Sequence, residues 1–118
     1  MASVLIVEDE ALTALALIGD LSDRGHVVRD AADGASAIDI LEQFWPDVLV
    51  TDMTMPRVDG AALIRHVRAI AGRRLPIVLV TGIPQSKLPS GLGYDIYMSK
   101  PVDHDALGSA VARLAETH

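Results

Sequence analysis

A short apolar segment that ends in one carboxylate constrains this chain more than any other feature. Residues 48–51 are apolar or β-branched and run directly into Asp52, with Pro46 before the segment and Pro56 and Gly60 after it. Such a run, bounded by turn residues, is typical of a strand buried on both faces of a parallel sheet. Asp52 is therefore expected at the carboxyl end of a central strand, where open α/β sheets bind ligands. A simpler interpretation is an aspartate that caps the next helix.

The alternation of apolar strands with helical patterns continues along the chain. Strands are expected at residues 3–7, 26–29, 48–51, 77–80 and 94–98, and helices at residues 12–21, 35–44, 60–70 and 102–114. This alternation predicts βαβ units and a parallel sheet with helices on both faces. We interpret residues 1–118 as one domain.

The segment between the last two predicted strands breaks the helical pattern. Pro84 could open a helix, but Pro89 follows five residues later and would disrupt it, and Gly91 and Gly93 disfavour any continuation. We therefore expect a short or disordered fourth helix, with at most one or two turns, in a mobile loop.

Composition excludes several classes of function. The formal net charge of −6 argues against nucleic-acid binding, and the chain has no cysteine for disulfides or thiolate metal sites. The apolar run at residues 11–18 follows three acidic residues and is too short to span a bilayer, which predicts a soluble cytoplasmic protein. Four histidines share no spacing and are interpreted as surface residues: His26, His66, His104 and His118.

Reactive side chains follow the ends of the predicted strands. Because the carboxyl ends of parallel strands share one edge, we expect three carboxylates, a hydroxyl and an ammonium to converge there. They are Glu8 and Asp9 after the first strand, Asp52 after the third, Thr81 after the fourth and Lys100 after the fifth.

This set of side chains suits a divalent cation and phosphoryl chemistry. Carboxylates placed together repel unless a cation lies between them, and hard oxygen ligands without histidine or cysteine suit Mg²⁺. With Mg²⁺ and Lys100 neutralising its charge, Asp52 could attack a phosphoryl group, and Thr81 could donate a hydrogen bond to a phosphoryl oxygen. Each residue alone also fits an ordinary role, such as an acidic first helical turn or a solvated lysine. Their joint placement favours the functional interpretation.

In this order and spacing the residues resemble the receiver domain of response regulators in two-component signalling. The similarity extends over essentially the whole sequence. The matching residues are Glu8-Asp9, Asp52 with Met55-Pro56 and Gly60, Thr81-Gly82, and Tyr97 with Lys100-Pro101.

The resemblance implies an α/β, flavodoxin-like fold, with a doubly wound five-stranded parallel sheet in the order 2-1-3-4-5. It implies that Asp52 is the phosphorylation site and accepts a phosphoryl group from a histidine kinase or a histidine phosphotransfer protein. By the same resemblance Asp9, Asp52 and the backbone carbonyl of Thr54 would bind Mg²⁺, and Glu8 would reach the ion through water.

The resemblance also assigns a switch. Thr81 and Tyr97 would form the switch pair, and Lys100 would bind the phosphoryl group, with a cis bond between Lys100 and Pro101. The chain would then be a phosphoprotein of a two-component system or phosphorelay that switches a protein-interaction surface. It would be no enzyme beyond catalysing its own phosphorylation and dephosphorylation. The alternative is a receiver-like interaction module that acts without phosphorylation.

Two other families fit less well. A phosphatase of the haloacid-dehalogenase type would need a second acid two residues after its nucleophile, where this chain has Thr54. A flavin or dinucleotide binder would need a glycine-rich loop after the first strand, and that loop is acidic here.

The first predicted helix has more apolar surface than a narrow buried face requires. Its positions 11, 14, 15 and 18 form one stripe, which Leu17 and Leu21 widen. The stripe is either a broad core contact or a docking surface for the helices of a phosphodonor or for a second copy of this chain, a homodimer.

Overall fold

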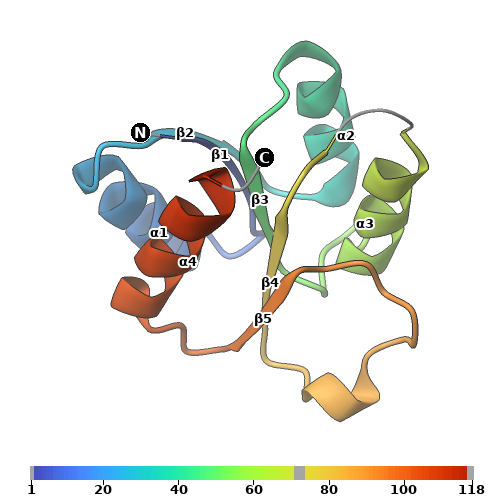
Figure 1. The fold of residues 1–118 in the computed structure, drawn as a ribbon. Helices are drawn as coiled ribbons and strands as arrows, with labels where there is room; N and C mark the ends of the chain where they lie inside the picture. Colours follow the sequence, from blue (N-terminus) through green and yellow to red (C-terminus); the bar gives the residue numbers. More distant parts are fainter. Residues whose placement is uncertain (1, 71–73, 117–118) are drawn as a thin grey trace.

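The computed structural model describes residues 2–70 and 74–116 and shows an open parallel sheet flanked by helices (Figure 1). Its strands pair in the order β2-β1-β3-β4-β5, which confirms the predicted topology. In chain order the elements are β1 (Ser3–Val7), α1 (Ala11–Asp23), β2 (Val27–Ala31), α2 (Gly34–Gln43), β3 (Val48–Thr51), α3 (Gly60–Ala69), β4 (Ile77–Thr81), the 3-10 helix η1 (Gln85–Lys87), β5 (Ile96–Ser99) and α4 (His104–Glu116).

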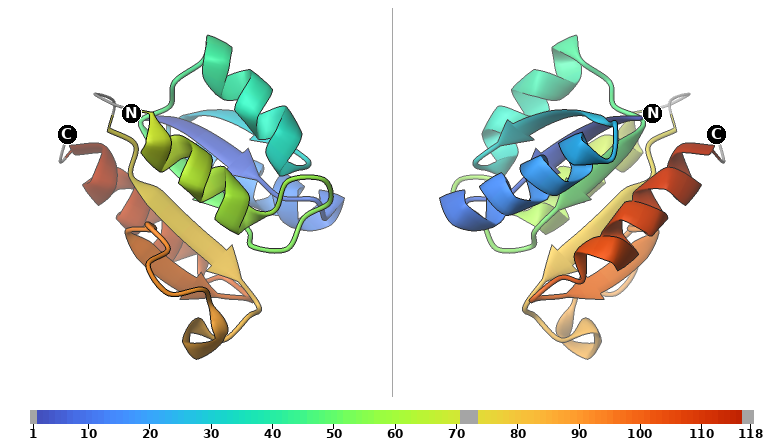
Figure 2. Two further views of the ribbon diagram at one scale, coloured as in Figure 1. Left: turned by 90° about the vertical axis from the view of Figure 1, so that its right-hand side faces the viewer. Right: turned by 90° about the vertical axis from the view of Figure 1, so that its left-hand side faces the viewer.

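The helices cover the two faces of the sheet in pairs. Figure 2 shows α2 and α3 on one face and α1 and α4 on the other. The buried apolar side chains divide in the same way, since Leu5, Leu49 and Ile77 pack in the cluster with α2 and α3, whereas Val4 and Val50 pack in the cluster with α1 and α4. Alternate residues of each strand therefore serve opposite faces, as the geometry of a strand requires.

The central strands have no solvent-facing side. Every residue of β3 and β4 is buried, and β1 is buried after its first residue. This explains why these strands are continuous apolar runs rather than alternating ones. Pairing of Val7 with Thr51, and of Thr51 with Leu79, brings the carboxyl ends of β1, β3 and β4 level with one another.

The connection between β4 and β5 contains only the three-residue η1, which confirms that no full helix forms there. It extends beyond the carboxyl end of β4 and returns toward β5 on the side of α3 (Figure 1). Ile83, Leu88 and Leu92 of this connection pack partly buried against the cluster with α2 and α3. The connection thus covers apolar surface without a helix, and its mobility stays a prediction.

Arg68 of α3 attaches the end of this connection to the sheet. Its guanidinium donates to the carbonyl oxygens of Gly93 and Leu75 at 2.8 and 2.7 Å and to a carboxylate oxygen of Asp95 at 3.0 Å. The same Asp95 oxygen accepts from the backbone N–H of Ile77 at 2.7 Å. The backbone N–H of Asp95 also donates to the carbonyl oxygen of Ile77 at 2.8 Å, so Asp95 is held to the start of β4 by its main chain and its side chain. The strand β5 itself begins at Ile96 rather than at the predicted residue 94.

The buried face of α1 differs from the predicted stripe. Ala14, Leu17 and Leu21 are buried, and Ile18 is partly buried against the same cluster. Leu15, which was expected in the stripe, is instead 64 % exposed. Of the two alternatives left open for the stripe, the exposed Leu15 fits a docking surface, whereas Leu17 and Leu21, which were expected to widen the stripe, face the sheet.

Among the helices that the structure describes, none combines the length and the apolar character that crossing a membrane requires.

Candidate functional site

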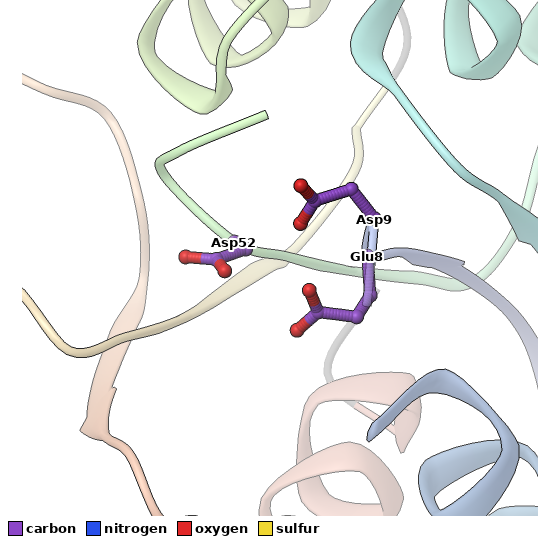
Figure 3. Close-up of side chains that lie close together, drawn as sticks. All are labelled: Glu8, Asp9 and Asp52. Atoms are coloured by element: carbon purple, nitrogen blue, oxygen red, sulfur yellow. The ribbon is translucent and has the colours of Figure 1, made fainter. Parts of the chain in front are cut away.

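Three carboxylates gather where β1 and β3 end. Glu8 and Asp9 directly follow β1 and Asp52 directly follows β3, and one oxygen of each lies within 4.8 Å of the others. Figure 3 shows the three side chains grouped at this edge of the sheet. Glu8 and Asp52 are buried, and Asp9 is exposed. We call Glu8, Asp9 and Asp52 the acidic pocket.

Lys100 lies against the acidic pocket. Its Nζ donates to Glu8 Oε1 at 2.6 Å and to Asp52 Oδ2 at 2.7 Å. The backbone N–H of Lys100 donates to the carbonyl oxygen of Thr81 at 3.0 Å, so the pairing of β5 with β4 places this lysine. The Lys100–Pro101 peptide bond is cis, as the resemblance implied.

The environment shifts the ionisation of two of these groups. Burial raises the pKa of Glu8, and this outweighs the hydrogen bonds from Lys100 and from the backbone N–H of Glu10 that act in the opposite direction. Burial by itself would lower the pKa of Lys100, but its hydrogen bonds with Asp52 and Glu8 raise it overall. Lys100 is therefore held as an ammonium, whereas the ionised form of Glu8 is disfavoured.

Both oxygens of Asp52 have partners. Oδ1 accepts from the backbone N–H of Met53 at 2.6 Å, and Oδ2 accepts from Lys100. The backbone N–H of Asp52 donates to the carbonyl oxygen of Val7 at 3.1 Å, which continues the pairing of β3 with β1. The nucleophile candidate is thus fixed by its own strand, and its carboxylate is oriented toward Lys100.

The two predicted switch residues converge on the residue that opens the β4–β5 connection. Thr81 is buried, and its Oγ1 accepts from the backbone N–H of Ile83 at 3.2 Å. The hydroxyl of Tyr97, which is partly buried, donates to the carbonyl oxygen of Ile83 at 2.6 Å. Ile83 is therefore held at both of its backbone polar groups by Thr81 and Tyr97.

The structure brings Glu8, Asp9, Asp52 and Lys100 together as predicted. Thr81 joins them through the backbone contact with Lys100. Thr54 lies exposed in the loop after β3.

One ion pair near the acidic pocket was not predicted from the sequence. Arg57 binds Asp33 with two hydrogen bonds of 3.0 and 2.9 Å. The sequence carried only a turn signal at Asp33-Gly34 and nothing that pairs it with a residue 24 positions away.

Four histidines were predicted to be surface residues, and this prediction was wrong for one of them. His26 is partly buried, and its Nδ1 accepts from the backbone N–H of Ala2 at 3.0 Å, so it is not a free surface residue. His66 is exposed as expected, and His104 is partly exposed. His118 lies outside the described residues.

The pocket's chemistry fits a small hard cation. The three carboxylates offer only oxygen atoms as ligands. The carboxylate of Asp9 is exposed, so an ion can reach it from solvent. Two buried carboxylates share one ammonium, so the pocket retains negative charge that a divalent ion would neutralise. The residues therefore match the donor set that Mg²⁺ prefers.

Comparisons with known proteins agree on one family. Residues 4–112 match the family model of the response regulator receiver domain. The chain is 37 % identical over 114 residues to the response regulator MprA of Mycobacterium avium (strain 104). That match covers 94 % of this chain and 48 % of MprA, so the chain spans about half the length of this relative.

Solved structures show the same architecture. The Francisella response regulator 1452 receiver domain superposes with a TM-score of 0.90 at 26 % identity, covering 98 % of each chain. The receiver domain of the sensor histidine kinase PA1611 from Pseudomonas aeruginosa PAO1, solved with a magnesium ion coordinated in the active site cleft, gives a TM-score of 0.86 at 27 % identity, again over 98 % of each chain. With its fold, its acidic pocket and its sequence in agreement, this chain belongs to the family of response regulator receiver domains.

Proposed function

We propose that this domain accepts a phosphoryl group on Asp52 from a phosphohistidine of a histidine kinase or phosphotransfer protein, in the presence of Mg²⁺. The observation that supports this most is the convergence of Asp52 with Glu8, Asp9 and Lys100 at one edge of the sheet. The PA1611 receiver domain, which holds magnesium in its active site cleft, supports the proposed cation.

The chemistry follows from these groups. An oxygen of the Asp52 carboxylate attacks phosphorus, a P–O bond forms, and the P–N bond to the donor imidazole breaks with its electron pair leaving on nitrogen. Asp9, Asp52 and the carbonyl of Thr54 would hold Mg²⁺, which would supply positive charge that reduces repulsion between the carboxylates and the phosphoryl group. Lys100 exchanges its contact with Asp52 for a phosphoryl oxygen. Water would later hydrolyse the acyl phosphate, and we propose no reaction of the domain beyond its own phosphorylation and dephosphorylation.

The switch would act through Ile83. When Thr81 turns its hydroxyl to donate to a phosphoryl oxygen, Oγ1 leaves the backbone N–H of Ile83 that it now accepts from. Tyr97 would then be free to change its contact with the carbonyl of Ile83. The surface that responds would be the β4–β5 connection, which takes the place of a full helix.

Incubation with acetyl phosphate and Mg²⁺ tests the proposal. We expect a labile mass increase of one phosphoryl group in the intact protein, and none after addition of EDTA or in Asp52→Asn. Hydrogen exchange of residues 83–92, measured with and without beryllofluoride, reports the switch in the same preparation.

The outcomes separate the alternatives. Labelling that persists in Asp52→Asn contradicts the acceptor assignment, and labelling that ignores EDTA contradicts the cation's role. A folded wild-type protein that takes no label is instead the interaction module that acts without phosphorylation. Unchanged exchange at residues 83–92 contradicts the proposed output surface.

We further propose that the exposed leucines of α1 contact the phosphodonor. Leu12 and Leu15 are 78 % and 64 % exposed and lie on the helix that begins two residues after Asp9. Ile18, which the sequence placed in the same stripe, packs partly buried and belongs to the core instead. The proposed contact is therefore smaller than the sequence suggested, and it adjoins the acidic pocket.

Substitution of Leu15 by Glu should slow phosphotransfer about tenfold, equivalent to about 1.4 kcal/mol, because the charge would have to lose its hydration at an apolar contact. Labelling by acetyl phosphate should stay unchanged. The donor is the histidine kinase that labels wild-type protein fastest in a panel. Val27→Glu is the matched control, because Val27 is 49 % exposed but lies on β2. Equal transfer rates for Leu15→Glu and Val27→Glu would contradict the contact.

A further inference from the structure

Arg57 has an unusual backbone conformation for a residue with a side chain. It lies in the loop between β3 and α3, and its φ is 66°, a left-handed value that the Cβ atom disfavours. Within residues 2–70 and 74–116 it is the one non-glycine residue with a positive φ. Glycine would adopt this conformation without strain, so something about the arginine side chain must offset the cost.

The side chain of Arg57 forms a bidentate ion pair across two loops. Its Nε and Nη2 donate to the two oxygens of Asp33 at 3.0 and 2.9 Å, and Nη2 also donates to Ser36 Oγ at 3.1 Å. Two parallel hydrogen bonds of this kind fix direction as well as distance. The Arg57 guanidinium lowers the pKa of Asp33 to about 2, so the pair stays ionised throughout the physiological range. Asp33 in turn caps α2 by accepting from the backbone N–H of Ser36 at 2.8 Å.

The main chain beside Arg57 makes a second connection between the same loops. The backbone N–H of Gly34 donates to the carbonyl oxygen of Val58 at 3.0 Å, and the loop lies beside the start of α2 (Figure 2). The approach is so close that a Cβ atom on Gly34 would lie 2.1 Å from that carbonyl oxygen. The loop is thus held to α2 by both its main chain and the Arg57 side chain.

The other end of the loop belongs to the acidic pocket. It starts at Met53, whose N–H donates to Asp52 Oδ1, and the carbonyl oxygen of Met53 accepts from the N–H of Gly60 at 2.8 Å. Between these fixed points lies Thr54, which is exposed and whose carbonyl the proposed function assigns to Mg²⁺. The contacts that hold the loop at Arg57 and Val58 therefore restrict where the carbonyl of Thr54 can lie.

We propose that the Arg57–Asp33 pair is a positioning clasp that holds residues 53–59 in the conformation in which the carbonyl of Thr54 can share a cation with Asp9 and Asp52. The clasp rests on the proposed function, because it assumes that a cation binds there. It acts through the loop, and neither residue contacts the phosphoryl group. The positive φ of Arg57 costs energy, and on this proposal its benefit is that it gives the loop the conformation in which the carbonyl of Thr54 can bind the cation.

The experiment compares Mg²⁺ affinity with stability in the same variants. Mg²⁺ dissociation constants come from titration calorimetry, and free energies of unfolding come from urea titration of the metal-free proteins. In Arg57→Gly the loss of the ion pair and the relief of backbone strain oppose each other, so stability should change little. The Mg²⁺ affinity should fall about tenfold, the lower end of the effect seen when groups that support metal ligands are lost.

Further variants separate positioning from charge. Arg57→Lys keeps the positive charge but loses the planar guanidinium that bonds both oxygens of Asp33. Its Mg²⁺ affinity should lie between those of wild type and Arg57→Gly. Asp33→Asn retains a helix-capping side chain and should weaken Mg²⁺ binding as Arg57→Gly does. The double variant should bind Mg²⁺ no more weakly than either single one, because the two residues act as a unit. Arg24→Gly is the control, since Arg24 also forms ion pairs with two carboxylates, Asp20 and Asp105, but neither belongs to the β3–α3 loop or to the acidic pocket.

Three results would overturn the clasp. If wild-type protein binds Mg²⁺ and Arg57→Gly binds it equally well, the ion pair is only a contact between loops, and the proposed function still stands. If Arg24→Gly weakens Mg²⁺ binding as much as Arg57→Gly does, the effect is general and not positional. Wild-type protein that binds no Mg²⁺ at all would remove both the clasp and the cation of the proposed function.

Discussion

Replacing Gly60 by Ala is expected to destabilise the domain by about 3 kcal/mol, the upper part of the range for overpacked positions. A Cβ atom at this residue would lie 2.2 Å from the carbonyl oxygen of Asp52 and 2.8 Å from Cα of Met53. Both atoms belong to the main chain, which cannot move aside as a flexible side chain would. The clash would also displace Asp52, so labelling by acetyl phosphate should fall together with stability.

Urea unfolding of the metal-free protein measures this effect. Gly19→Ala is the matched control, because Gly19 lies within α1 and its added Cβ would meet nothing within 4 Å. The control should be more stable than wild type by about 1 kcal/mol, since alanine favours a helix over glycine. A Gly60→Ala protein within about 0.5 kcal/mol of wild type would show that the β3–α3 loop moves freely around Asp52.

Replacing Lys100 by Met is expected to lower the free energy of unfolding by about 2 kcal/mol near neutral pH. Breaking a fully buried ion pair costs about 3–5 kcal/mol, and the effect is smaller here because the Lys100 side chain is 27 % exposed. The substitution leaves the carboxylates of Glu8 and Asp52 close together without a cation. Folding then favours a protonated Glu8 even more than it does in wild type, where burial already raises its pKa.

The pH dependence has a definite sign. A carboxyl group whose pKa is higher in the folded protein binds more protons when folded, so stability falls as pH rises from about 4 through the folded pKa. The deficit of Lys100→Met relative to wild type should therefore be larger at about pH 7 than at about pH 5. Millimolar Mg²⁺ should stabilise the variant more than wild type, because the ion no longer competes with an ammonium.

Lys87→Met provides the control for the Lys100 variant, because Lys87 is exposed on η1. It should change neither stability nor the response to Mg²⁺. A deficit for Lys100→Met that is the same at both pH values would contradict the account of Glu8. A smaller stabilisation by Mg²⁺ than in wild type would contradict competition between lysine and the ion.

The central strands could be predicted from the residues because a strand that is buried on both faces is a continuous apolar run, whereas the order of the strands came only from the resemblance to receiver domains. Each of β1, β3 and β4 is a continuous apolar run, and the chemical residues come immediately after these runs. The edge strands β2 and β5 are less buried and less uniformly apolar, so their sequences indicate their ends less clearly. Residues of β2 are mostly exposed, and β5 is partly exposed, so their ends were displaced by one or two residues in the prediction.

Contacts between loops could not be predicted for a different reason. The pairing of Arg57 with Asp33 depends on the backbone of Arg57 taking a positive φ, which no neighbouring residue type indicates. On α1, periodicity identified an apolar helix, but the direction of its buried face depends on how the helix packs against the sheet. Leu15 and Leu17 are equally apolar, and only the packing makes Leu17 the buried one.

The division of the core into two clusters has a consequence for how the domain responds to change. The sheet separates the two clusters. A change in side-chain packing under α1 and α4 can therefore affect the cluster under α2 and α3 only by moving the backbones of the strands. Perturbations in the two compartments are then energetically independent, apart from the strand ends that both compartments share. Asp52 and Thr81 lie at those ends. A rearrangement at this edge can therefore alter the packing on both faces of the sheet, whereas a substitution within one cluster acts on its own face.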